Sequence, residues 1–295
     1  MDSDEEAYIL LLLSDGNLPT GSFVASAGLE SYATHGFLSP LPEQKGKDKV
    51  ACLVDFIRNS LSTYARNSLP FVHDAMRVVQ QIIDGTSSDE SGWLDRALQD
   101  LSALDDLYET MTLNHVSRRA SKSQGVALLT LYSKGFSKPR SSIPREDIRQ
   151  HRISTLVDKF KLMIRREDTH GHLPVCWGVL TGSLGLSLER SQFLHLFLHA
   201  RSLLSAAVRM NTIGPYASQQ LLLHTVRPLV FSEAKNCSHL CTGLRVSLPG
   251  QHSEIDEDSR FDEDVLESQG PAMTWPLGEI LAGRHDLQHS RIFNS

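Results

Sequence analysis

Apolar residues at steps of three and four recur through most of this 295-residue chain, and no other feature constrains its fold as strongly. In residues 93–113, WLDRALQDLSALDDLYETMTL, leucine, tyrosine and methionine follow this spacing, and aspartate and arginine lie between them. Because a helix has about 3.6 residues per turn, such residues share one face. The same spacing recurs in 54–64, 71–82 and 194–208, whereas the alternation typical of strands is scarce. The sequence therefore predicts an all-α protein.

The helical segments are expected to form one domain. Polar, Gly- or Pro-rich breaks fall at 38–49, 84–92, 135–145 and 247–271, and none of them separates two independently patterned halves. We predict one helical-bundle-like domain of roughly eight to ten helices with inserted loops over residues 1–246. Residues 247–271 are expected to be a disordered insertion, because 253–267 carry eight acids against Arg260 alone. Residues 272–295 then form a separate C-terminal segment.

Charge and cysteine content limit the class of protein. The formal net charge of −6 gives no electrostatic footprint for nucleic acid, and the basic stretch 138–166 is interpreted as a solvated helix face. The apolar run at 8–13 is far shorter than the roughly 20 residues of a membrane span. Four cysteines without a C-x-x-C pair suit a reducing compartment. We predict a cytoplasmic protein with no nucleic-acid and no membrane partner.

The segment SDGNLPTGSF, residues 14–23, follows that apolar run, which the sequence allows to be a strand, and has the glycine spacing of a P-loop. Gly16 and Gly21 match the motif, but Ser22 stands in the place of its lysine and Phe23 in the place of its Mg²⁺-binding hydroxyl. Since these two groups hold the phosphates and the metal, we expect neither GTP nor ATP to bind. No stably bound cofactor is predicted.

Two patterns contain residues that ligate metals. His195 and His199 are four apart and share a helix face, but the glutamate of a zincin motif is missing, and a place on the surface or in a helix contact is favoured over metal binding. The stretch CSHLC offers Cys237, His239 and Cys241 as a weak soft-metal candidate without a fourth ligand. No serine on a strained elbow, reactive lone cysteine or paired carboxylate is recognisable, so the sequence predicts no enzyme.

Four segments together resemble one family. LPTGSFVASAGLESYATHG, residues 18–36, has a Pro-x-Gly-x-Phe turn followed by Ser-x-Gly-Leu-Glu, formed by Pro19, Gly21, Phe23, Ser26, Gly28, Leu29 and Glu30. HLPVCWGVLTGSLGL at 172–186 and LLSAAVRMNTIGPYASQQLL at 203–222 come next in the chain. RHDLQHSRIFNS at 284–295 ends it and supplies Arg284, His285, Gln288, Ser290, Arg291 and Phe293. In this order the segments resemble the signatures of the urease accessory protein F family, UreF.

The chain departs from the family pattern at three places. Asp286 stands in place of the usual glutamate, His289 in place of the usual tyrosine, and SQGVALL at 123–129 lacks the arginine of the family's Gly-Arg-Ser-Leu-Leu stretch. These differences concern single positions and leave the order of the four segments intact.

The resemblance implies an all-α homodimer that links a GTPase of the UreG type to a second accessory protein of the UreD or UreH type. This assembly docks on apo-urease and delivers nickel, which is in transit and not a resident cofactor. The residues named in 19–30 and 284–293 are then partner-binding positions, and 272–295 is expected to be poorly ordered until the second accessory protein engages it. Two points stay open: modulation of GTP hydrolysis, and the alternative of a nickel carrier that binds metal through Cys237, His239 and Cys241 or through the histidine pair.

Overall fold

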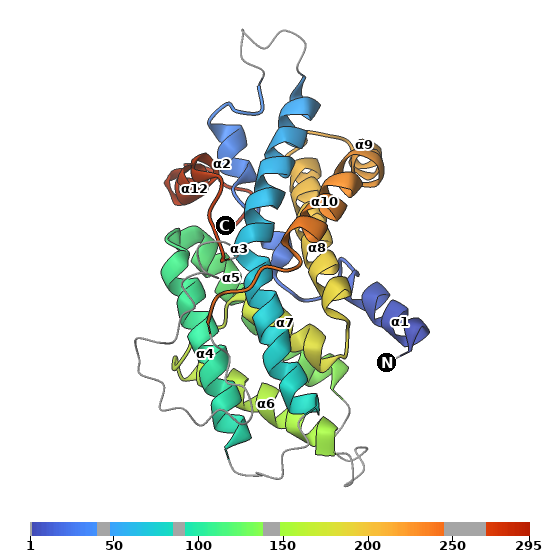
Figure 1. Cartoon of the computed structure of the whole chain (residues 1–295). Helices are drawn as coiled ribbons and strands as arrows, with labels where there is room; N and C mark the ends of the chain where they lie inside the picture. The colour runs from blue at the N-terminus through green and yellow to red at the C-terminus, as the bar shows by residue number, and fades with distance from the viewer. Residues whose placement is uncertain (1, 40–47, 85–91, 138–147, 245–269) are drawn as a thin grey trace.

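One long helix, α3 (Lys49–Asp84), runs through the middle of the molecule, and the other helices pack around it (Figure 1). The apolar repeats at 54–64 and 71–82 both belong to this helix, which continues through Pro70. A proline inside a helix removes a hydrogen bond and normally kinks or ends it. Here its neighbours Leu69 and Phe71 are completely buried, so core packing on both sides favours the continuous helix.

The computed structural model describes residues 2–39, 48–84, 92–137, 148–244 and 270–295. Besides α3, the helices are α1 (Ser3–Leu13), α2 (Leu29–Thr34), α4 (Trp93–Met111), α5 (His115–Leu131), α6 (Ile148–Arg165), α7 (Leu173–Ser183), α8 (Leu188–Arg209), α9 (Pro215–Gln220), α10 (Arg227–Cys237) and α12 (Pro276–Gly283). Short 3₁₀ turns η1 (Ser22–Val24) and η6 (His285–Leu287) and π-helical turns η2 (Tyr132–Phe136) and η4 (Leu221–Val226) complete the set. The turn η4 joins α9 to α10 without a break.

The prediction of an all-α domain is confirmed. Counting the continuous α9–η4–α10 rod once gives 10 helices in these ranges, and none of the described residues forms a β-strand. Helix α4 spans almost the whole of the periodic stretch at 93–113. Most of the four predicted breaks, and residues 247–269 of the predicted disordered insertion, lie outside the described residues.

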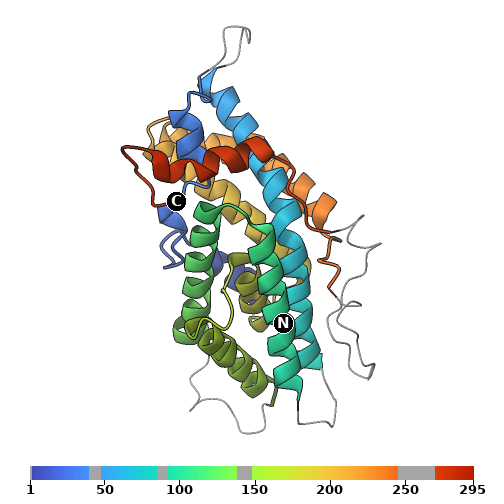
Figure 2. The same cartoon turned by 90° about the vertical axis from the view of Figure 1, so that its left-hand side faces the viewer.

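Buried apolar side chains form two clusters, one along each half of α3. The N-terminal half of α3 lies above its C-terminal half in Figures 1 and 2, so we call the clusters upper and lower. The lower cluster joins the C-terminal half of α3 to α4, α5, α6 and α7, and includes Phe160 and Trp177. The upper cluster joins the N-terminal half to α2, α8 and α10, and includes Phe56 and Phe293. The last residues of the chain therefore belong to the upper core.

Helix α7 approaches α3 closely because glycines face it. A Cβ atom added at Gly178 would lie 2.7 Å from Ala75 Cβ, and one at Gly182 would lie 3.1 Å from Val79 Cβ. From the sequence alone, Gly178, Gly182 and Gly185 lie near one face of a helix and predict close contact with another helix; the structure confirms this contact for Gly178 and Gly182. Gly185 is different, because it is exposed and follows the end of α7 with a φ of 80°.

A buried carboxylate fixes the loop that precedes α7. Asp105 of α4 accepts hydrogen bonds from Thr169 Oγ1 at 2.7 Å and from the backbone N–H groups of His170, Gly171 and His172 at 2.8, 2.6 and 2.8 Å. These bonds offset the cost of removing the carboxylate from water. The loop and α4 are therefore held in one arrangement.

The apolar run at 8–13 belongs to helix α1, so the strand that the sequence allowed there is wrong. Asp2 stabilises the start of α1 by accepting hydrogen bonds from the N–H groups of Asp4 and Glu5 at 2.9 and 2.8 Å. No helix among the described residues is both long and apolar enough to cross a membrane.

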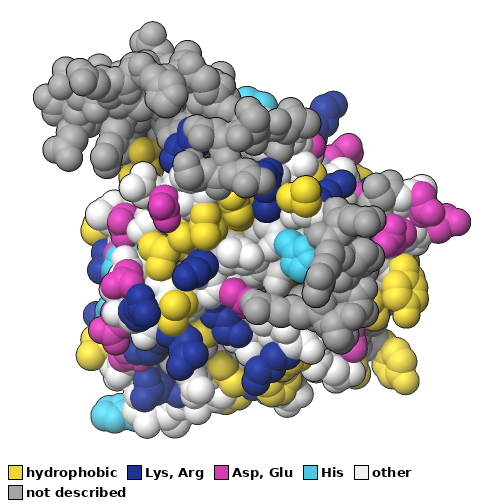
Figure 3. All heavy atoms as spheres, turned by 90° about the horizontal axis from the view of Figure 1, so that it is seen from below, with side chains coloured by type: hydrophobic (Ala, Val, Ile, Leu, Met, Phe, Trp, Pro, Cys, Tyr) yellow, Lys and Arg dark blue, Asp and Glu magenta, His cyan; other side chains and the backbone are white. Residues whose placement is uncertain are grey.

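The basic stretch lies partly on α6, at the lower end of the molecule. Arg149, Lys159 and Arg165 are exposed there, and Figure 3, seen from below, shows lysine and arginine side chains spread among apolar ones. This agrees with a solvated helix face for the described part of 138–166.

Candidate partner-binding site

The first and last motif segments lie together beside the upper core (Figures 1 and 2). We call residues 19–30 and 276–295 the terminal junction. Gly28 precedes α2 with a φ of 82°, and a Cβ atom added there would lie 3.0 Å from that of Ala282 in α12. Both the left-handed backbone and the close approach of α12 favour glycine at this position.

Glu30 connects α2 to the tail. Its Oε1 accepts a hydrogen bond from the backbone N–H of Ile292 at 2.5 Å, and its Oε2 accepts one from Phe293 at 3.2 Å. His285 is completely buried beside it, with Nδ1 3.8 Å from Glu30 Oε2 and Nε2 3.2 Å from the Phe293 carbonyl oxygen. The tail therefore supplies the donors that a buried carboxylate at position 30 requires.

Backbone pairing extends this connection on both sides. The N–H of Asn294 donates to the carbonyl of Val24 at 2.8 Å, and the N–H of Ser26 donates to the carbonyl of Ser295 at 2.5 Å. The two segments thus satisfy one another's backbone groups, which are costly to bury unpaired.

An arginine from a third segment completes the junction. The guanidinium carbon of Arg209, in α8, lies 3.7 Å from the ring centroid of Phe23 and 4.2 Å from that of Phe293. Arg209 also donates a hydrogen bond to the Phe23 carbonyl. Cation–π contact with both rings therefore links one ring from each end of the chain to α8.

Asp286 forms the centre of an ion-pair network on the outer side of the junction. Arg119 of α5 binds its two carboxylate oxygens at 2.9 Å each, Arg291 binds Oδ1 at 2.9 Å, and His115 lies 3.2 Å from Oδ2. The hydrogen bonds from Arg119 are the main reason that the pKa of Asp286 lies well below its usual range. Although the family usually has glutamate at this position, the carboxylate of Asp286 is held by two arginines.

The predicted partner-binding residues divide into a buried and an exposed group. Those that hold the junction together are buried: Ser26, Gly28, Leu29, Glu30, His285 and Phe293. Those that a partner can reach are exposed, namely Pro19, Gly21, Phe23, Arg284, Ser290 and Arg291, while Gln288 is half-buried. The structure brings both segments together, and the buried group contributes to the fold.

The tail packs on the body of the chain, contrary to the expectation that 272–295 is poorly ordered on its own. Leu281 and Phe293 are buried against the chain's own core, and Glu30 binds the tail backbone. Four other apolar residues of the tail face outward: Leu277, Ile280, Leu287 and Ile292 are 42%, 63%, 72% and 56% exposed. The tail therefore has an anchored side and an open apolar side.

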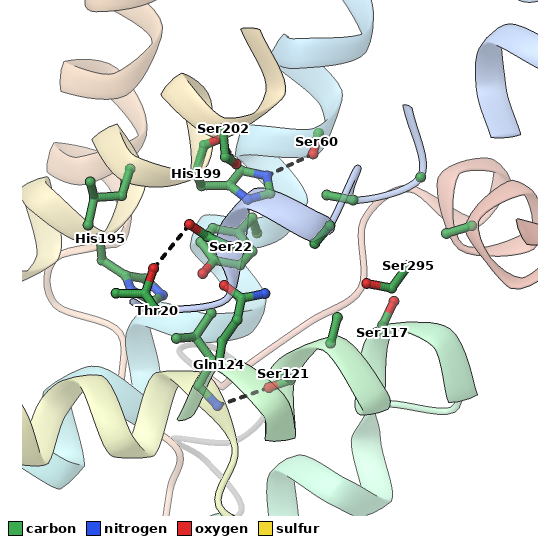
Figure 4. A pocket seen from close by; sticks show the side chains of 18 of the residues that line it. Thr20, Ser22, Ser60, Ser117, Ser121, Gln124, His195, His199, Ser202 and Ser295 are labelled. Carbon is green, nitrogen blue, oxygen red and sulfur yellow. Dashed lines mark hydrogen bonds between the residues drawn. The ribbon is translucent and has the colours of Figure 1, made fainter. Parts of the chain in front are cut away.

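A cavity of about 290 Å³ lies under the junction, between residues 15–28, α3, α5, α8 and the tail (Figure 4). Uncharged polar side chains from all these segments line it: Thr20, Ser22, Ser60, Ser117, Ser121, Gln124, His195, His199, Ser202 and Ser295. Apolar side chains such as Leu18 and Leu128 and the charged side chains of Asp15, Arg201, Arg209 and Glu279 also line it, so the cavity has mixed polarity.

The histidine pair packs between helices, which is one of the two places that the sequence favoured. The rings of His195 and His199 stack on Tyr64 of α3, with centroids 5.0 and 3.9 Å from its centroid. Loss of hydration lowers the pKa of both imidazoles to about 3. Although His199 Nε2 lies 2.9 Å from Ser60 Oγ, so weak a base activates a serine hydroxyl poorly. The low basicity of His199 therefore makes it a poor general base for Ser60.

The weak metal candidates are not brought together. Cys237 is buried at the end of α10, where burial raises the pKa of its thiol to about 11, whereas His239 is exposed and Cys241 is half-buried. Within the described ranges, no three histidine, cysteine or acidic side chains are placed to hold a metal ion. The CSHLC stretch is therefore not a preformed site.

Sequence reasoning missed two residues that build the junction. Arg209 lies within the 203–222 segment, but no spacing connects it to rings at the two ends of the chain. Arg119 belongs to α5, in a stretch with no family-like pattern, and its role depends on Asp286 lying opposite. Arg119 could have been found from the sequence by asking which arginine pairs with the tail carboxylate of Asp286.

The chain is thus an all-α protein in which a segment near its start and the C-terminal tail are joined beside a long central helix. The chain belongs to the UreF family, whose model matches residues 48–226. It is 45% identical to "Urease accessory protein 6" of Cryptococcus neoformans var. grubii over 99% of this chain and 98% of the relative.

Two further relatives support this assignment. The chain is 29% identical to an "Uncharacterized urease accessory protein UreF-like" of Schizosaccharomyces pombe, over 100% of this chain and 99% of the relative. It is 32% identical to "Urease accessory protein F" of Oryza sativa subsp. indica, over 95% and 82%. Membership of this family gives the chain a role in urease maturation.

Proposed function

We propose that the chain is a non-enzymatic scaffold for urease maturation. It acts as a homodimer in the cytoplasm, links a UreG-type GTPase to a UreD- or UreH-type accessory protein, and supports nickel insertion into apo-urease. The observation that carries the proposal is the terminal junction, in which two family-like segments from opposite ends of the chain form one surface.

The chemistry of this surface fits a protein partner. Outward-facing Ile280 and Leu287 provide apolar contact area, and exposed Arg284 and Arg291 provide forked donors at its edge. At protein–protein interfaces, buried apolar residues and arginine often contribute much of the binding free energy. The second accessory protein is the partner proposed for this side of the tail, and its binding precedes recruitment of the GTPase.

Replacement of the outward-facing residues tests the proposal. Ile280→Asp with Leu287→Asp should leave helicity unchanged, because both side chains face solvent, and should abolish the three-component complex in a pull-down of the GTPase. Ile148→Asp is the matched control, since Ile148 is 62% exposed on α6 at the other end of the molecule. Undiminished assembly of the tail variant with both partners would refute this docking surface.

The alternative function is a nickel carrier that uses Cys237, His239 and Cys241. The separate surroundings of these side chains favour the scaffold, in which nickel is cargo of the assembly. Calorimetric titration of the isolated chain with Ni²⁺ separates the two functions. Tight binding that is lost in Cys237→Ser with Cys241→Ser would establish the carrier. GTP turnover by the GTPase, with and without this chain, decides whether hydrolysis is modulated.

A further inference from the structure

Helix α1 has an outward face that the body of the chain leaves uncovered. Only Leu13 is buried in this helix, whereas Tyr8 and Leu11 are 64% and 71% exposed. Asp4 and Glu5 are exposed about one turn before Tyr8, so acidic and apolar groups share this face. An apolar helix face that remains in water indicates a contact with another surface.

The α9–η4–α10 rod has a complementary face. Tyr216, Leu223 and Phe231 are 88%, 55% and 51% exposed. Arg227 lies between the last two at four-residue steps, with its guanidinium carbon 5.6 Å from the Phe231 ring centroid, and exposed Lys235 follows after four more residues. Neither Arg227 nor Lys235 forms an ion pair with a described residue. This face is apolar and basic where the face of α1 is apolar and acidic.

We infer that two copies of the chain pair reciprocally, with α1 of each copy docked antiparallel on the α9–η4–α10 rod of the other. This inference rests on the proposed homodimer and specifies its contacts. In this arrangement Asp4 and Glu5 face Arg227 and Lys235, and Leu11 lies near Leu223. The antiparallel direction also places the positive end of the α1 dipole beside the negative end of α10.

Dimensions and position agree with this pairing. At 1.5 Å per residue the 11 residues of α1 span about 16 Å, and the stretch from Leu223 to Lys235 spans about 20 Å. Figure 1 shows α1 and α9 on the same side of the molecule, with α10 leading away from α9. A two-fold axis on that side forms both contacts at once, as a closed dimer requires.

A second copy is favoured over an internal contact because α1 is already anchored elsewhere on its own chain. Leu13 is buried in the lower core, and Glu6 Oε1 accepts hydrogen bonds from the backbone N–H and the Oγ of Ser187 at 2.9 and 2.8 Å. Docking α1 on its own α10 would break these contacts. A partner copy meets the outward face without disturbing them.

Two charge-reversed variants test the pairing. Asp4→Lys with Glu5→Lys makes the α1 face basic, and Arg227→Glu with Lys235→Glu makes the rod acidic. Each variant alone should raise the dimer dissociation constant at least about tenfold in sedimentation velocity, because like charges then face each other at both contacts. An equimolar mixture should recover dimers, since each chain then meets an opposite charge at both contacts. Lys159→Glu with Arg165→Glu, on α6, is the control and should not change the constant.

Disulfide trapping gives a second measurement that does not depend on helix-end charge. A mixture of Leu11→Cys chains and Leu223→Cys chains should form an interchain disulfide under mild oxidation, and Ile148→Cys in place of either should not. If the parent chain dimerises but the charge variants dimerise equally well and no disulfide forms, this pairing is wrong while the homodimer stands. A parent chain that stays monomeric at high concentration overturns both.

Discussion

Glu30 Oε1 accepts a hydrogen bond of 2.5 Å from the backbone N–H of Ile292, a residue 262 positions later in the chain. With the bond to Phe293, this carboxylate ties the start of α2 to the tail. The contact explains why the family-like segments at the two ends of the chain can act as one surface. Substitution of Glu30 should therefore change how firmly the tail is held.

Glu30→Ala should release the tail while the helical body stays folded. The N–H groups of Ile292 and Phe293 then lose a charged acceptor, at a cost of about 1–3 kcal/mol in the free energy of unfolding. Hydrogen exchange of residues 285–295 should accelerate more than that of α3. Unchanged protection of the tail would show that Glu30 does not hold it.

Acid should loosen the outer side of the junction through Asp286. Its pKa is lowered in the folded chain, chiefly by hydrogen bonds from Arg119, so the stabilisation is complete above the ordinary aspartate value of 3.8 and is lost as the pH falls through the folded value. The contribution of Asp286 to the hydrogen-exchange protection of the tail should therefore stay constant from neutral pH down to about 4 and decrease below it. In Asp286→Asn the contribution of this group to that decrease should vanish.

Asp105→Asn should destabilise the whole domain. In the variant, the NH₂ group of the asparagine faces the N–H and O–H donors of the loop before α7, whose hydrogen bonds the carboxylate accepts in the parent chain. The free energy of unfolding should therefore fall by about 2–5 kcal/mol. Urea denaturation measures it. Asp106→Asn is the matched control, because the neighbouring Asp106 is exposed, and it should change stability far less. Equal effects of the two substitutions would refute the structural role given to Asp105.

Gly178→Ala should lower the melting temperature, since the added Cβ lies 2.7 Å from Ala75 Cβ and 2.9 Å from the Val72 carbonyl oxygen. Overpacking of this kind costs about 1–3 kcal/mol. Gly16→Ala serves as the control, because no atom lies within 4 Å of a Cβ there. A Gly178→Ala protein as stable as the parent would mean that α3 and α7 separate without cost.

The isolated chain should bind neither GTP nor ATP. Gly21 has the φ of 74° of a left-handed turn, and Ser22–Val24 form a 3₁₀ turn without the lysine that phosphate charge requires. Equilibrium dialysis with either nucleotide tests this. Micromolar affinity that Gly21→Val abolishes would restore the phosphate-loop interpretation of residues 14–23.

The amino-acid sequence by itself determined the all-α class of the fold and several of its helices. The spacing in 93–113 predicted α4, and the glycines at 178 and 182 predicted a close helix contact, because helix periodicity and residue size are local properties. The order of four short segments was also enough to indicate the family. None of this required knowing which helices meet.

Only the tertiary structure decided what those elements do together. Pro70 remains inside one helix because the core encloses it, and the rings of His195 and His199 stack on Tyr64. The joining of Glu30 to Ile292, and of Arg119 to Asp286, depends on how the whole chain packs. Contacts between residues so far apart have no local pattern, since their energies arise only when folding buries the groups side by side.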